Sequence, residues 1–111
     1  MNEKQQIKQL TTGQRLKAMR LLTGLVQDEF AEIIGMPLSR LKNVETRSRM
    51  YDHEIEDVLT IFPEFAKWLS YQGDITLGEL QESQSKLCRI VAAKLDAGIY
   101  PEGYDLENKI K

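Results

Sequence analysis

The sequence predicts an all-α fold, and three observations support this prediction. Apolar residues recur at spacings of three and four along the chain, as they do on one face of a helix. The alternation of apolar and polar residues that is typical of strands is almost absent. Glycines and prolines stand between the periodic segments and divide them into short units. With 111 residues, the chain is long enough for one domain with a single hydrophobic core.

The first half predicts three short helices. Thr12 is placed to cap the first helix, and Gly24 ends it because glycine is free to take the left-handed turn. Gly35 ends the second helix, and Pro37 suits the first turn of the third. The expected helices cover residues 13–22, 27–34 and 37–45, and a loop follows at 46–49. Their inward-facing residues are predicted to be Leu16, Met19, Phe30, Ala31, Ile34, Leu41 and Val44.

The second half predicts three further helices. Asp52 can cap the fourth, and Pro63 opens a fifth that ends near Gly73. A single longer helix is expected from Thr76 to about Ala97. The apolar residues of the fourth and fifth helices are Ile55, Val58, Leu59, Phe62, Phe65, Trp68 and Leu69.

Composition excludes several classes of protein. One cysteine, Cys88, cannot form an internal disulfide, and one histidine, His53, cannot build a zinc site with it. No acid–base or nucleophile set can be assembled, so we expect neither an enzyme nor a metal or other cofactor. No segment approaches the ~18 apolar residues of a membrane-spanning helix, and no secretory signal is expected in the polar N-terminus. We therefore expect a cytoplasmic protein.

The charges of the chain are unevenly distributed. Residues 1–50 hold nine Lys/Arg against five Asp/Glu, whereas residues 51–111 hold six against twelve. The first half is thus net +4 and the second net −6, although the whole chain is only −2. A basic half of this kind favours a local surface that binds a polyanion.

The most informative stretch is residues 13–52. Two short helices separated by Gly35 at this spacing are typical of a helix-turn-helix, whose second helix is offered to the DNA major groove. The ordered residues that match are Arg15-Leu16-Lys17-Ala18-Met19-Arg20, Gly24-Leu25-Val26-Gln27, Glu29-Phe30-Ala31, Gly35, Ser39, Leu41 and Val44-Glu45. In this set the chain resembles the Xre family, the Cro and lambda-repressor type of bacterial and phage DNA-binding domains. The resemblance covers about residues 12–73.

The resemblance implies a five-helix, lambda-repressor-like DNA-binding domain with an additional C-terminal helix. We expect an N-terminal leader at 1–11, the helix-turn-helix domain at 12–73, and a helix and tail at 74–111 that form a dimer. The implied function is a transcriptional regulator, in the first place a repressor, that binds operator DNA as a homodimer. One alternative is an antitoxin that controls its own promoter and binds a toxin. Another is an interaction adaptor that has lost DNA binding. A protein partner, either a toxin or an antirepressor, is compatible with the first two hypotheses.

The resemblance also assigns contacts to DNA. Leu38, Ser39 and Asn43 match positions that reach base edges, and Lys42 lies beside them. Asparagine can pair with adenine, lysine can donate to guanine, and leucine can touch a thymine methyl. Contacts with phosphates are expected from Gln27, Arg40, Thr46, Arg47 and Arg49.

Arg20 and Glu45 occupy positions that form an ion pair in many members of the family, so we expect a scaffold role for them. Ala31 and Gly35 are small where the two helices of the motif are expected to cross, so that a larger side chain would separate them. Val26 departs from the family, since Ser, Thr or Asn often caps the second helix there.

The segment beyond the resemblance carries an apolar stripe with one polar residue in it. Spacings of three and four favour a helix, and we expect it to cover its own domain with one face and to pair with a second copy through another. The alternative is that the stripe packs on Phe62, Phe65 and Trp68 of the same chain. The residues predicted for the dimer interface are Leu80, Gln84, Leu87, Val91 and Leu95.

Overall fold

The computed structural model describes residues 11–46, 49–70 and 77–99, and in these ranges the chain is helical and contains no strand. This confirms the all-α prediction. No helix in these ranges is long and apolar enough to cross a membrane. The elements are α1 (Thr12–Thr23), α2 (Gln27–Ile34), α3 (Leu38–Thr46), α4 (Asp52–Ile61), a 3₁₀ turn (Pro63–Phe65) that leads into α5 (Ala66–Leu69), α6 (Leu77–Gln81) and α7 (Lys86–Asp96).

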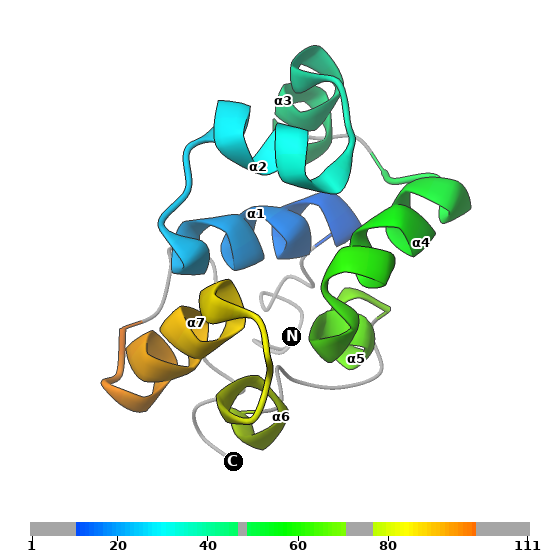
Figure 1. Cartoon of the computed structure of the whole chain (residues 1–111). Helices are drawn as coiled ribbons and strands as arrows, with labels where there is room; N and C mark the ends of the chain where they lie inside the picture. The colour runs from blue at the N-terminus through cyan, green and yellow to red at the C-terminus, as the bar shows by residue number, and fades with distance from the viewer. Residues whose placement is uncertain (1–10, 47–48, 71–76, 100–111) are drawn as a thin grey trace, which may run out of the picture.

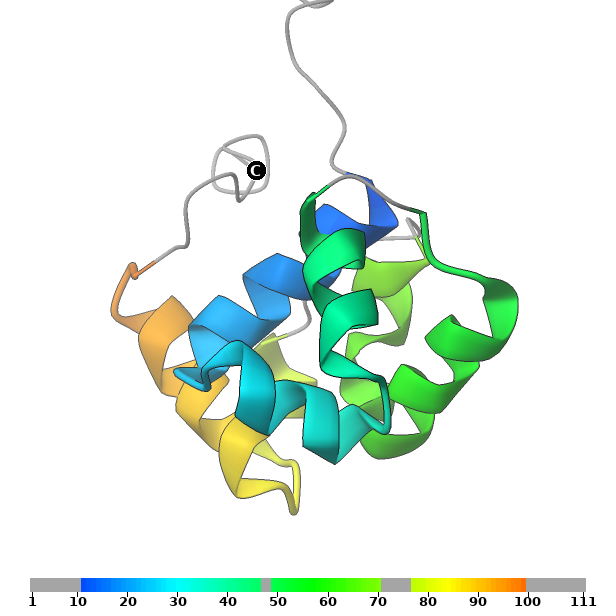
Figure 2. The ribbon, with the colours of Figure 1, turned by 90° about the horizontal axis from the view of Figure 1, so that it is seen from above.

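Helix α1 lies at the centre of the fold (Figure 1) and contacts α3, α5 and α7. Helices α2 and α3 pack against each other on one side of α1, and α6 pairs with α7 on the opposite side. Seen from above (Figure 2), α4 and α7 lie to either side of α1. This arrangement presents α2 and α3 together at one end of the molecule.

The helix ends follow the predicted residues with small shifts. Thr11, not Thr12, caps α1: its hydroxyl accepts from Gln14 N at 3.1 Å, and Gln14 Oε1 accepts from Thr11 N at 2.9 Å. This reciprocal pair satisfies two backbone donors at the start of the helix. Gly24 and Gly35 end α1 and α2 in the left-handed conformation, with φ of 84° and 73°, as predicted.

The expectation that Gly35 must be small to let two helices cross is wrong. A Cβ placed on Gly35 would meet no atom within 4 Å. Its backbone φ of +73°, which side chains rarely adopt, is therefore the requirement at this position. Ala31, by contrast, is 4% exposed and belongs to the core.

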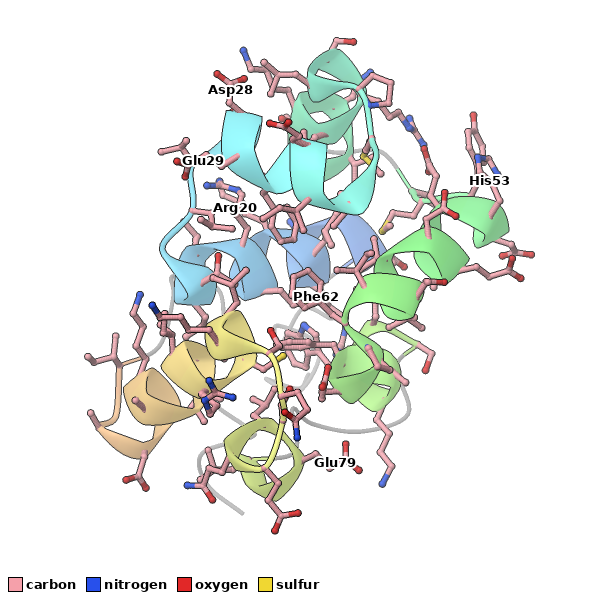
Figure 3. All side chains as sticks on the ribbon, in the orientation of Figure 1. Arg20, Asp28, Glu29, His53, Phe62 and Glu79 are labelled. Atoms are coloured by element: carbon pink, nitrogen blue, oxygen red, sulfur yellow. The ribbon has the colours of Figure 1, made fainter. Side chains whose placement is uncertain are left out.

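One core runs through all the helices. Every residue predicted to face inward from the first three helices is buried, and Val58, Phe62, Phe65, Trp68 and Leu69 join them. Ile55 and Leu59 are partly buried against the same cluster. Phe62 points into the middle of the molecule (Figure 3), where its ring stacks on Phe30 at 6.1 Å between centroids.

The prediction of a single C-terminal helix is wrong, because the chain forms α6 and α7 with a turn between them. Ser83 and Ser85 explain the break. Ser85 Oγ caps α7 by accepting from Cys88 N at 3.3 Å, and Ser83 Oγ accepts from Ser85 N at 2.9 Å and donates to Glu64 at 2.6 Å. Serine side chains bonded to nearby backbone in this way favour caps and turns over helix interiors.

Two of the five residues predicted for the dimer interface are buried in their own chain. Leu80 and Val91 are 0% exposed and belong to the core of their own chain, while Leu87 and Leu95 are partly buried against it. Gln84 is exposed in the turn between the two helices. Leu80 and Val91 therefore pack within the chain, where α7 contacts α1 and α6.

Candidate nucleic-acid interface

Helix α3 has one buried side and one exposed polar side. Leu41 and Val44, one turn apart, are both 0% exposed and fix the orientation of the helix. Ser39, Lys42 and Asn43 are exposed. Three of the four residues predicted to contact bases thus lie in solvent on one short helix.

Leu38, the fourth residue predicted to contact bases, differs from the other three. It is half-buried and packs against the core. Part of its surface therefore stabilises the start of α3, and only the remainder is accessible for contact with a ligand.

The predicted ion pair between Arg20 and Glu45 is present. Arg20 Nε lies 2.7 Å from Glu45 Oε2, and Nη2 donates to Oε1 at 3.0 Å. The two side chains are only 11% and 3% exposed. Arg20 Nη1 also donates to the Leu25 carbonyl at 3.0 Å, so one guanidinium joins α1, the turn before α2 and the end of α3. Figure 3 shows Arg20 in the space between α1 and α2.

Gln27, the first residue of α2, adds a third member to this cluster. Its amide nitrogen donates to Glu45 Oε1 at 2.9 Å. This hydrogen bond ties the start of α2 to the end of α3. The side chain is half-exposed, so the rest of its amide reaches solvent beside α3.

A second ion pair, between Arg40 and Glu54, was missed from the sequence. Arg40 Nε lies 2.7 Å from Glu54 Oε2, and Nη2 donates both to Oε1 and to the Arg49 carbonyl, at 3.0 Å each. The guanidinium also lies 4.7 Å from the centroid of the Tyr51 ring. Arg40 therefore fastens α3 to the start of α4, and Glu54 balances its charge within the protein.

The other residues predicted to contact phosphates are Thr46, Arg47 and Arg49. Thr46 is the last residue of α3, not a loop residue, and its hydroxyl donates to the Lys42 carbonyl at 2.7 Å. The helix thus already uses the donor that a phosphate would need. Arg49 is exposed, whereas Arg47 lies outside the described residues.

The start of α2 carries negative charge. Asp28 and Glu29 are exposed in its first turn (Figure 3). Val26 makes no side-chain cap, as predicted, and Glu29 Oε1 accepts from Val26 N at 3.3 Å in its place. The positive end of the helix dipole stabilises these two carboxylates, but the carboxylates repel a phosphate at the same place.

Cys88 and His53 lie outside α3, in α7 and α4. Cys88 is buried, its thiol donates to Glu64 at 3.4 Å, and burial raises its pKa. His53 is exposed at the start of α4, where its ring stacks on Tyr51. Within the described residues, no group of His, Cys, Asp and Glu could hold a metal ion.

Comparison with known proteins identifies no family for this chain. The chain matches no protein-family model, no curated protein and no solved structure. The interpretation of the site therefore depends on its own geometry and residues.

The Arg40–Glu54 pair gives a prediction for stability against pH. Hydrogen bonds from Arg40 hold the pKa of Glu54 below its ordinary value of 4.5, although burial opposes them. A carboxyl with a lowered pKa stabilises the fold fully above its ordinary pKa, and this stabilisation is lost as the pH falls through the lowered value. Glu54→Gln is expected to cost about 2 kcal/mol at pH 7, and the difference from wild type should shrink below about pH 4.5.

This pH dependence is measured by urea unfolding between pH 7 and pH 3, followed by the fluorescence of Trp68, the single tryptophan. Glu56→Gln, on an exposed position of the same helix, is the matched control and should change stability by less than about 0.5 kcal/mol. A Glu54→Gln deficit that stays constant across the whole pH range would contradict the role of the ionised pair.

Proposed function

We propose that the chain is a sequence-specific DNA-binding protein with a lambda-repressor-like fold, in which α3 enters the major groove. The observation that carries this proposal is the pair α2 and α3, joined through a left-handed Gly35, with the polar side of α3 in solvent. A helix-turn-helix requires this arrangement. The resemblance to the Xre family over residues 12–73 supports the same interpretation.

The cluster of Arg20, Gln27 and Glu45 gives the motif its rigidity. Its hydrogen bonds join α1, α2 and α3 at one point. Because the recognition helix is only nine residues long, it needs tertiary contacts to hold its orientation. The cluster therefore positions α3 and is not itself assigned a contact with bases.

Roles on the proposed DNA surface follow from exposure and donor chemistry. Asn43 can pair with an adenine and Lys42 can donate to a guanine, with Ser39 beside them. Gln27 and Arg49 are the described residues that we assign to phosphates, with Arg47 as a further candidate from the sequence. Arg40 is left out because Glu54 balances its charge, and Thr46 because its hydroxyl donates to the Lys42 carbonyl.

The biological role that we propose is a repressor acting as a homodimer. A two-fold dimer would place its two recognition helices about one turn of DNA apart, roughly 10 base pairs. Since Leu80 of α6 and Val91 of α7 belong to the core, the partner copy would have to use other residues of these helices. Leu87 and Leu95, which are partly buried, are the predicted interface residues that keep accessible surface on that helix.

Selection from a pool of randomised duplexes tests this function. The purified chain is incubated with the pool, and bound duplexes are recovered and sequenced over several rounds. The expected result is an enriched motif with two half-sites whose centres lie about 10 base pairs apart. A recovered pool identical to the starting pool would reject sequence-specific binding, and a single unpaired half-site would reject the dimer.

Removal of a negative charge at the start of α2 is expected to strengthen DNA binding, whereas most mutations of a DNA-binding surface weaken it. If α2 begins beside a phosphate, Asp28→Asn should strengthen binding to every duplex by about 0.5–1 kcal/mol, because it removes a repulsive charge. The gain should fall as salt is raised. Fluorescence anisotropy with labelled duplexes measures it. Glu79→Gln on α6, at the opposite end of the molecule (Figure 3), is the control and should leave affinity unchanged. Equal affinities for Asp28→Asn and wild type would place α2 away from the DNA.

A further inference from the structure

A groove separates the end of α2 from the outer side of α4. Its wider part, about 330 Å³, is lined by residues of both helices. A narrower part, about 80 Å³, continues it toward the turn before α3. The two parts share Ile34, Gly35 and Asp57 in their walls, so they adjoin each other.

Two large aliphatic side chains are left in solvent at this groove. Ile33 of α2 is 38% exposed and Ile61 of α4 is 44% exposed, and both line the wider part. Ile33 belongs to α2 and Ile61 to α4, so each of the two helices that line the groove contributes one isoleucine. A pair of exposed isoleucines across a depression favours an apolar anchor from a binding partner.

Three carboxylates line the two parts of the groove: Glu32, Glu54 and Asp57. Helices α2 and α4 together contain seven carboxylates and no lysine or arginine. Glu32 and Asp57 line the wider part of the groove. Among the described residues, no cation forms an ion pair with either of them, whereas Glu54 is paired with Arg40. The electrostatic field at the groove is therefore negative, which repels nucleic acid and attracts cations.

We propose that this groove is a docking site for a protein partner that presents an aliphatic side chain flanked by lysine or arginine. The aliphatic side chain would lie between Ile33 and Ile61, and the cations would pair with Glu32 and Asp57. None of Ser39, Lys42 and Asn43 lines the groove, so the proposed contacts do not use the polar side of α3. The proposal does not depend on DNA binding.

A labelled synthetic peptide with leucines on one helical face and lysines on the other is the probe, and fluorescence anisotropy with the full chain measures its affinity. The double variant Ile33→Ser/Ile61→Ser is expected to weaken binding about tenfold or more, and so is Glu32→Lys/Asp57→Lys. Glu79→Lys, one charge reversal on exposed α6, is the control and should change affinity less than twofold. All four substituted groove residues are exposed. Thermal melts of each variant verify that it is folded.

Three results would overturn the proposal. Absence of peptide binding to the wild-type chain would do so, and so would an equal loss of affinity in Glu79→Lys, which would show attraction to net charge alone. Sedimentation of the wild-type chain as a dimer that the isoleucine variant converts to a monomer would assign the groove to a second copy. Loss of peptide binding in both groove variants, with the control unchanged and no shift in sedimentation, is the result that the proposal predicts.

Discussion

Replacing Glu45 with alanine is expected to lower the free energy of unfolding by about 3–5 kcal/mol, because it leaves Arg20 charged and buried without its partner. The guanidinium makes two hydrogen bonds to that carboxylate, whose side chain is 3% exposed. Gln27 would lose its acceptor as well. Such a loss is a large fraction of the stability of a small domain.

Urea unfolding followed by Trp68 fluorescence measures this loss. Lys42→Ala is the matched control, since Lys42 is exposed on the same helix and should change stability by less than about 0.5 kcal/mol. The double replacement of Arg20 and Glu45 by leucine or methionine should recover much of the loss, because an apolar pair leaves no buried charge. An unfolding curve of Glu45→Ala that overlays the wild-type curve would show that the ion pair contributes nothing.

Replacing Asn43 with alanine is expected to weaken binding to a selected duplex by about 1–3 kcal/mol and to relax base preference at one position. Asn43 is exposed on α3, so this substitution should leave the melting temperature within a few degrees of wild type. Titrations of the selected duplex and of its single-base variants measure both effects. An equal loss of affinity on the selected duplex and on random DNA would contradict base reading by Asn43.

Arg49→Ala separates phosphate contact from base reading. It should weaken all duplexes alike and reduce the dependence of log K on log salt by roughly one unit of slope. Its carbonyl, which accepts from Arg40, is kept in this variant. A change in base preference with Arg49→Ala would mean that this residue enters a groove.

The helices of the first 70 residues were predictable because local signals agreed with the packing. Apolar residues at spacings of three and four became the buried sides of α1 to α4, and Gly24 and Gly35 took the left-handed turns that end two helices. The shift of the first cap from Thr12 to Thr11 shows the usual limit at helix ends.

The single C-terminal helix was mispredicted because the helical spacing of apolar residues was given more weight than the two serines that favour a turn. Leu80, Leu87 and Val91 keep helical spacing across the turn, so the stripe looks continuous in the sequence. Ser83 and Ser85, which favour turns and caps, were the available evidence for a break. The burial of Leu80 and Val91 then depends on tertiary packing, which spacing alone does not reveal.

The two ion pairs differ in how far the sequence could predict them. Arg20 and Glu45 lie 25 residues apart, and only the resemblance to a known family pointed to their contact. Arg40 and Glu54 are joined across a loop whose path the sequence does not fix. Glu54 at the third position of α4, where it accepts from Tyr51 N, matched a helix-start pattern, but nothing marked Arg40 as its partner.

The most direct test of sequence-specific binding is the ratio of two affinities of the wild-type chain, one for a selected duplex and one for random duplex, at a single fixed salt concentration. Anisotropy titrations with both labelled duplexes give this ratio. If α3 reads bases, the ratio should be about a thousand or more. A ratio near one would show that the chain binds DNA only through its charge, or not at all, and would contradict the proposed function.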